Sequence, residues 1–154
     1  MKLSENLSLS EVIRSESAKR RGIDNMPTPE HLANLKVIAE KIFQPIRENF
    51  RVPIHISSAY RSPDLNRAVK GSPNSQHCTG EALDIDMDGS PHGVTNADVF
   101  NFIKDKLDFD QIIWEFGSDT NPDWVHVSYR VKGGNRKQVL KAVKVNNQTK
   151  YLEI

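Results

Sequence analysis

Apolar residues recur at helical spacing between positions 32 and 50, and this stripe marks the clearest helix of the chain. The positions that form it are Leu32, Leu35, Ile38, Ile42, Phe43, Ile46 and Phe50. Thr28 can cap the helix, and Pro29 suits the first helical position because its missing N–H would be unpaired there anyway. The pattern therefore predicts a helix that begins at Pro29, ends near Asn49 and turns its apolar stripe toward the core.

Shorter patterns predict the remaining elements. Helical spacing extends over residues 8–15, 62–69 and 96–107. Strand-like patterns cover 52–58, 81–87, 111–116 and 124–130, and the last residues predict a hairpin that turns at Asn146-Asn147. Helices come first and strands later, without regular alternation. This order favours an α+β fold in which helices pack on an antiparallel sheet.

Length and composition fit one globular domain, which we expect to span residues 1–154. The chain is 37% hydrophobic and 27% charged, as is usual for such a domain. We divide it into a mainly helical part (1–50), a core that holds the candidate site (51–130) and a C-terminal hairpin (131–154). The formal net charge of +1 does not favour binding to nucleic acid or to a membrane surface, and we expect a monomer.

Candidate chemistry is concentrated in residues 75–86, SQHCTGEALDID. Alternation over 81–87 places Asp84 and Asp86 on one strand face, where neighbouring carboxylates repel each other unless a cation relieves the repulsion. A catalytic zinc ion takes three protein ligands from His, Asp and Glu and keeps a position for water. His77, Asp84 and His126 would supply such a set. The alternative is a loop and strand whose polar groups are only hydrogen-bonded.

Other polar residues are expected to play lesser parts. His31 should be solvated, and Asp86 should bond its own loop rather than act as a fourth ligand. Cys78 is the only cysteine, so no internal disulfide can form, and we expect it to be a bystander. A calcium site at Asp84, Asp86 and Asp88 is a further alternative, which the two histidines argue against because calcium prefers oxygen ligands.

Three segments resemble, in family order, the signature of the zinc D-Ala-D-Ala carboxypeptidases and phage L-alanoyl-D-glutamate endolysins. SQHCTGEALDID resembles the pattern Ser-x-His-x-x-Gly-x-Ala-x-Asp of that superfamily. SSAYRS (57–62) resembles its Ser-x-Tyr-Arg-Ser segment, and WVHVS (124–128) resembles its Trp-x-His strand. Residues 7–30 resemble the opening of the phage-type branch. The resemblance implies the hedgehog/DD-peptidase fold.

The resemblance also implies a function. It makes the chain a zinc metallopeptidase that binds one Zn²⁺ through His77, Asp84 and His126 and hydrolyses a bond in the peptide stem of bacterial peptidoglycan. Arg61 would stabilise the oxyanion that forms as water attacks, since its guanidinium keeps its charge and offers paired donors. Ser75 would hydrogen-bond the substrate. The plainer alternatives are an Arg61–Asp64 surface ion pair and a loop turn at Ser75.

The general base is assigned by the same resemblance. The superfamily places a carboxylate three residues before its last histidine ligand, which is Asp123 in this chain. In a straight strand, residues 123 and 126 point to opposite faces, so Asp123 would have to lie in a loop and swing inward. Glu115 is the rival base. We favour Asp123 because the family spacing suits a carboxylate within hydrogen-bond reach of the attacking water.

Several functional questions stay open at this point. The bond that is cut, by a D,D-carboxypeptidase or an L,D-endopeptidase, should depend on loops 70–76 and 117–123, with Tyr60, Trp114 and Trp124 as cleft walls. The alternative function is a catalytically silent zinc-holding domain that binds a wall peptide or a protein partner. The opening residues show no signal-peptide pattern. That absence fits equally a phage lysis or tail-associated enzyme, a cytoplasmic dipeptidase or a fragment of a larger protein. On the likeness of residues 7–30 alone, we expect a phage- or prophage-encoded protein made in the bacterial cytoplasm that acts on the cell wall, or a cytoplasmic protein otherwise.

Overall fold

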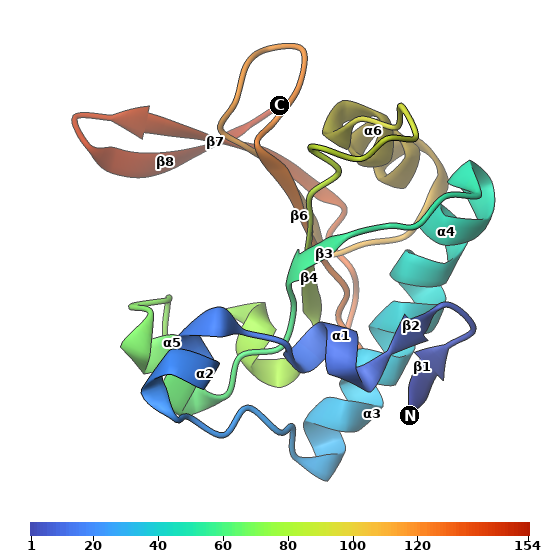
Figure 1. Ribbon diagram of the computed structural model, residues 1–154. Helices are drawn as coiled ribbons and strands as arrows, with labels where there is room; N and C mark the ends of the chain where they lie inside the picture. The colour runs from blue at the N-terminus through green and yellow to red at the C-terminus, as the bar shows by residue number, and fades with distance from the viewer.

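A six-stranded sheet forms the centre of the computed structural model, which describes residues 1–154 (Figure 1). In spatial order its strands are β3 (Ile56–Ser58), β4 (Ala82–Ile85), β6 (Trp124–Ser128), β5 (Gln111–Glu115), β7 (Gln138–Val145) and β8 (Gln148–Glu153). All neighbours are antiparallel except β5 and β7, which run parallel. Strand β6 has β4 on one side and β5 on the other, so the segment after β6 adds β7 to the free edge of β5. The expected α+β fold is confirmed, with a mostly antiparallel sheet.

A small ribbon of β1 (Lys2–Ser4) and β2 (Leu7–Ser8) lies at the N-terminus, and six α-helices pack beside the main sheet. They are α1 (Leu9–Ile13), α2 (Glu16–Arg21), α3 (Pro29–Ile38), α4 (Gln44–Phe50), α5 (Pro63–Ala68) and α6 (Asn96–Lys106), with a 3₁₀ turn at Gln76–Thr79. The sequence pattern predicted α1, α3, α4, α5 and α6, whereas it missed α2 and the 3₁₀ turn. None of the helices combines the length and apolar character needed to cross a bilayer.

The long predicted helix is continuous but not uniform. Between α3 and α4, residues Ala39–Phe43 form a π-helical turn, and the Gln44 N–H donates to the Ala39 carbonyl five residues back. Pro45 follows directly, and a proline inside an α-helix lacks a donor and clashes with the carbonyl four residues before it. The wider π turn accommodates this proline without ending the helix.

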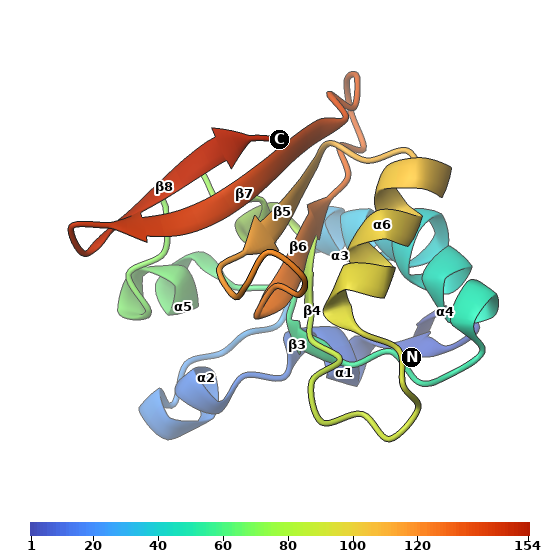
Figure 2. The same ribbon diagram turned by 90° about the horizontal axis from the view of Figure 1, so that it is seen from above.

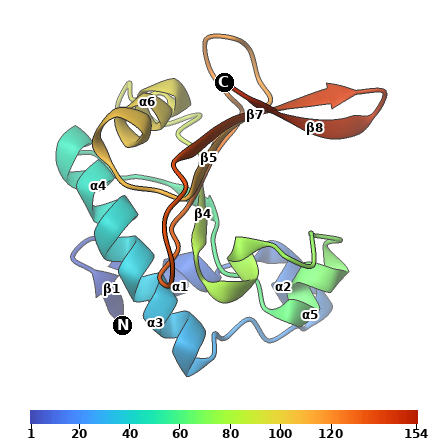
Figure 3. The same cartoon turned by 180° about the vertical axis from the view of Figure 1, so that it is seen from behind.

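The two faces of the sheet have different neighbours. The face that carries Leu83, Ile85, Ile112, Val125 and Val127 is fully buried and belongs to the main core, together with residues of α3, α4 and α6. Figures 2 and 3 show these helices gathered on one side of the sheet, while the β7–β8 hairpin extends away from them. Because side chains alternate along a strand, the polar residues between these core positions all point to the opposite face.

The C-terminal hairpin confirms the turn predicted at Asn146-Asn147. Both residues have positive φ, 52° and 62°, which suits the tight turns that join antiparallel strands and which asparagine tolerates better than most residues. The other four predicted strands are all shorter than expected. Strand β3 covers only the last residues of 52–58 and β4 only Ala82–Ile85 of 81–87, while β5 ends at Glu115 and β6 at Ser128.

Candidate metal centre and cleft

Three side chains converge on the polar face of the sheet: His77, Asp84 and His126. Asp84 on β4 pairs directly with His126 on β6, and His77 reaches them from the 3₁₀ turn at Gln76–Thr79. Asp84 Oδ1 lies 3.3 Å from His77 Nε2 and 3.0 Å from His126 Nδ1. One potential ligand atom from each residue lies within 4.8 Å of the others. The structure thus brings together the three residues that the sequence singled out.

The orientation of His77 is set by its own backbone surroundings. Its Nδ1 donates to the Ala59 carbonyl, which leaves Nε2 free to face Asp84. The Ser75 hydroxyl accepts from the His77 N–H and caps the turn. Gly80 ends the turn with φ of 77°, and a Cβ there would lie 2.6 Å from the His31 carbonyl oxygen. Only glycine fits that position, and its conformation delivers the chain into β4.

The donor set suits a zinc ion. Two imidazoles and a carboxylate are ligand types of catalytic zinc sites, and ligands about 2.0–2.1 Å from a tetrahedral ion lie roughly 3.3 Å apart. The separations around Asp84 are of this size. Burial alone would raise the pKa of Asp84, but His77 and His126 outweigh it and hold this pKa well below the ordinary range. The carboxylate therefore stays ionised, as a metal ligand must.

A cleft of about 870 Å³ opens over these three residues. Arg61 and Ser75 line it, and Arg61 Nη2 donates to Ser75 Oγ over 3.3 Å. The Nε of Arg61 is buried without a hydrogen-bond partner. The alternative of an Arg61–Asp64 ion pair is wrong, because Asp64 pairs with Arg67 instead. Arg61 therefore presents a guanidinium with unused donor capacity beside the candidate metal site.

The two candidate bases are placed differently, and the structure contradicts the position expected for Asp123. Its side chain is exposed, does not line the cleft and lies near the acids Asp86 and Asp88. Its N–H donates to the Glu115 carbonyl, which starts the β5–β6 pairing and fixes the alternation with Asp123 pointing away from His126. Asp123 does not swing inward.

Glu115, at the end of β5, takes the place that was expected for Asp123. It is buried and lines the cleft together with Asp84 and His126. Burial raises the pKa of the Glu115 carboxyl to about 7; His126 lowers it and Asp84 raises it further. A carboxyl with a pKa near neutrality beside a candidate metal site is typical of a proton-transfer group.

Some other expectations were wrong in detail. Trp124 lines the cleft, but Trp114 lies in the core against Phe100, and Tyr60 does not line the cleft either. His31 is half-buried and its Nδ1 bonds the Tyr60 hydroxyl, so it is not simply solvated.

Loop 70–76 lines the cleft as expected, whereas loop 117–123 does not. Asp86 bonds its own loop at the Asp88 N–H, as expected.

Sequence analysis missed a buried acid that supports the site. Asp110 is fully buried and accepts hydrogen bonds from Arg136 Nε, Arg136 Nη2 and Gln76 Nε2 at 2.8 to 3.1 Å. Burial would raise the pKa of Asp110, but these bonds lower it to about 2. Gln76 directly precedes His77, so Asp110 ties the histidine-bearing turn to the sheet. No local pattern around Asp110 indicated this role.

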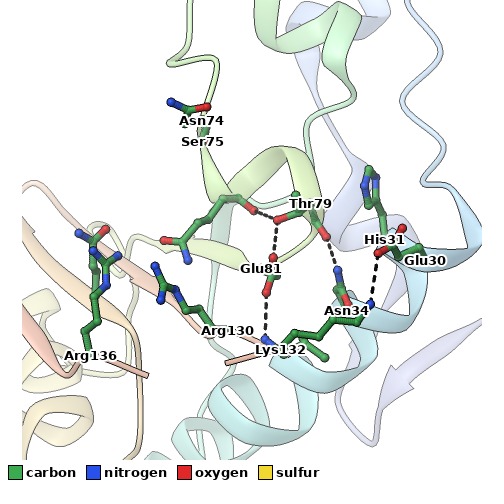
Figure 4. A pocket seen from close by; sticks show the side chains of 13 residues that line it. Glu30, His31, Asn34, Asn74, Ser75, Thr79, Glu81, Arg130, Lys132 and Arg136 are labelled. Carbon is green, nitrogen blue, oxygen red and sulfur yellow. Dashed lines mark hydrogen bonds and ion pairs between the residues drawn. The ribbon is translucent and has the colours of Figure 1, made fainter. Parts of the chain in front are cut away.

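A second, polar cavity of about 440 Å³ adjoins the cleft (Figure 4). The two share Asn74, Ser75, Gln76, Gln111 and Arg136. Figure 4 shows Arg136 on one side of this cavity and His31 and Asn34 on the other. The space over the candidate metal site therefore continues in both directions, toward this cavity and toward the C-terminal hairpin.

Two imidazoles, a carboxylate and a buried glutamic acid in an open cleft are the parts of a metal-dependent hydrolase site. The chain belongs to the Peptidase M15 family, whose family model matches residues 5–128. This family has the hedgehog/DD-peptidase fold, so both the resemblance and the expected fold are confirmed. A search of curated proteins found no match.

Proposed function

We propose that the protein is a zinc-dependent peptidase that hydrolyses a bond in the peptide stem of bacterial peptidoglycan. The observation that carries the proposal is the buried carboxyl of Glu115, with its pKa raised to about 7, in the same cleft as His77, Asp84 and His126. Burying an acid without a hydrogen-bond partner lowers the stability of the fold, and a domain that only holds zinc does not need such an acid for its function. The alternative of a catalytically silent binding domain leaves Glu115 unexplained.

His77, Asp84 and His126 would hold one Zn²⁺ in this proposal. When bound, zinc would polarise the peptide carbonyl and make the attacking water more acidic. Glu115 takes a proton from that water as its oxygen bonds to the carbonyl carbon. The same carboxyl then gives the proton to the leaving amine as the carbon–nitrogen bond breaks.

Arg61 and Ser75 would bind the substrate. The positive charge of Arg61 and the guanidinium N–H groups that its bond to Ser75 leaves unused are suited to the oxyanion that develops on the carbonyl oxygen. Ser75 already accepts from Arg61 and from the His77 N–H, so its hydroxyl proton is free to be donated to a substrate oxygen.

The cleft favours an L,D-endopeptidase over a D,D-carboxypeptidase. A carboxypeptidase closes one end of its cleft around a terminal carboxylate, whereas this cleft continues past Arg136 into the adjoining cavity and, on the other side, toward the hairpin. We propose, on the resemblance of residues 7–30 alone, that the setting is a phage or prophage enzyme acting on the cell wall.

The test is digestion of purified peptidoglycan by protein whose zinc content has been measured. Mass spectrometry of the released fragments identifies the bond, since a carboxypeptidase releases free D-alanine and an endopeptidase releases a peptide. We expect the protein to contain one zinc ion per chain and to release a peptide from the peptidoglycan. If zinc is in place but no fragment appears from peptidoglycan or from peptides ending in D-Ala-D-Ala, the silent binding domain becomes the better explanation.

A further inference from the structure

The β7–β8 hairpin lies outside residues 5–128, the part of the chain that the family model matches. One face of it nevertheless lines the same cleft as the candidate metal ligands. The hairpin residues that line the cleft are Gln138, Leu140, Lys144, Thr149, Tyr151 and Glu153. They come from alternate positions of both strands, so a whole face of the hairpin is turned toward the site.

Strand pairing places Tyr151 in register with the proposed base. Glu115 on β5 pairs with Ala142 on β7, and Ala142 pairs with Tyr151 on β8. The three residues therefore form one row across the sheet, on the face that carries His126. The middle position is the small residue alanine. Ala142 is fully buried.

The electrostatics agree with this placement. The pKa of Tyr151 is raised, first by burial and then by the carboxylates of Glu115 and Asp84. Both acids are therefore close enough to act on the phenol across the cleft. The phenol stays protonated near neutral pH and can donate a hydrogen bond. No hydrogen bond within the protein uses this hydroxyl.

The hairpin is held in place on one side only. Strand β7 is anchored by its parallel ladder with β5 and by the Gln111–Gln138 side-chain bond of 2.6 Å. Strand β8 pairs with β7 alone, and all of its residues are exposed. An exposed strand whose polar face borders a catalytic cleft gains contacts when a substrate fills that cleft.

We propose that the β7–β8 hairpin forms the wall of the substrate cleft beside Glu115, and that Tyr151 contacts the bound peptide by donating its O–H to a carbonyl oxygen. This inference rests on the proposed peptidase function. In this proposal the hairpin shapes the cleft together with loop 70–76, in the place that was expected for loop 117–123. Arg61 and Tyr151 would then contact the peptide from opposite sides of the three candidate metal ligands.

The test compares three variants with the wild type: Tyr151→Phe, Tyr151→Ala and Leu152→Ala. Leu152 is the matched control, because it is the next residue on β8, is 49% exposed against 56% for Tyr151, and does not line the cleft. Two quantities are measured. The first is kcat/KM for peptidoglycan fragments with zinc bound; the second is co-sedimentation of metal-free protein with insoluble peptidoglycan.

Tyr151→Phe should lower kcat/KM about tenfold, as one lost hydrogen bond to substrate would. Tyr151→Ala should lower it further and also reduce co-sedimentation, while Leu152→Ala changes either quantity less than twofold. A role in packing alone predicts that Tyr151→Phe is neutral, because the ring remains. Unchanged melting temperatures show that the variants are folded.

The outcomes separate this inference from the proposed function. If the wild type cuts peptidoglycan and the Tyr151 variants cut it equally well, the hairpin proposal is wrong and the peptidase proposal stands. If zinc-loaded wild type cuts nothing, the peptidase proposal fails, and co-sedimentation alone decides. If Tyr151→Ala then co-sediments less than Leu152→Ala, the hairpin still forms a wall of the binding cleft. If the two variants co-sediment equally, or if the wild type does not co-sediment at all, the hairpin proposal is wrong.

Discussion

Glu115 and His126 lie on the same face of the sheet, on neighbouring strands and one diagonal step apart. Ile113 on β5 pairs with His126 on β6, so Glu115 stands two residues further along β5 and its side chain points the same way. Asp123, which is nearer to His126 in the sequence, points to the opposite face. This relationship decides which carboxyl can serve the candidate metal site.

Substituting each carboxyl in turn should show whether Glu115 or Asp123 is the general base. We expect Glu115→Gln to lower kcat by about 10²- to 10⁴-fold while zinc stays bound, because the variant cannot accept the proton of the attacking water. Asp123→Asn is the matched control and should retain activity within a factor of about 3, since its side chain is exposed away from the cleft. The opposite ranking would restore Asp123 as the base.

Metal content should depend on the three converging residues. We expect about one zinc per chain in the wild type, by analogy with single-ion catalytic sites, and its loss in His77→Ala and His126→Ala. His55→Ala is the control, because His55 is exposed and lies outside the cleft. Mass spectrometry of protein purified without chelator gives the metal content. A full zinc complement in His77→Ala would show that the metal binds elsewhere.

The raised pKa of Glu115 predicts a pH dependence of stability in the metal-free protein. An unfolded glutamate loses its proton near pH 4.5, but folded Glu115 keeps it up to about pH 7. The folded state then holds more protons than the unfolded state in this window, so the free energy of unfolding falls as pH rises through it, by about 3 kcal/mol.

Glu115→Gln should remove this loss. Urea unfolding at pH 5 and pH 8, in the presence of a chelator, measures the difference for both proteins. We expect the wild type to lose more stability than the variant between the two pH values. Parallel behaviour of the two proteins would mean that Glu115 titrates normally.

Arg61→Lys should keep the charge but lose the planar set of donors. We expect kcat to fall about 10- to 100-fold, because the ammonium cannot replace paired hydrogen bonds to an oxyanion. Arg67→Lys is the control, since Arg67 is exposed and pairs with Asp64. Steady-state kinetics on the same substrate compares the two variants. Equal activity would remove Arg61 from the proposed mechanism.

Asp110→Asn should destabilise the protein and loosen its metal site. Its buried, charge-assisted bonds to Arg136 are worth about 2–3 kcal/mol, and Gln76 loses an acceptor next to His77. Asp108→Asn is the control, because Asp108 is exposed and pairs only with Lys137. Thermal unfolding and zinc titration give both quantities.

The pKa of Asp110, lowered to about 2, also fixes the pH range of its contribution. The stabilisation is complete above the unfolded pKa of about 4 and is lost as pH falls from there toward 2. The stability difference between wild type and Asp110→Asn should therefore shrink in that range. A constant difference down to pH 2 would contradict the assigned pKa.

The sequence by itself determined most of the helices, the strands of the main sheet and the three candidate metal ligands. The apolar stripe over residues 32–50 predicted the long helix because helical period and burial are local properties. The motif around His77 and Asp84 carries its own geometry, since Gly80 and the short span to β4 bring both side chains to one place. Residue types already made His126 the candidate third ligand, and the resemblance to the family supported that choice.

Only the tertiary structure pointed to Glu115 as the proposed base, to Asp110 as the support of the His77 turn and to the hairpin as the proposed second wall of the cleft. The pairing register of β5 with β6 turned Glu115 inward and Asp123 outward, and register depends on contacts between strands rather than on either strand alone. Asp110 reaches the site through Gln76, 34 residues away in the sequence. Tyr151 comes into range only because β7 adds to β5 in parallel and β8 folds back beside it.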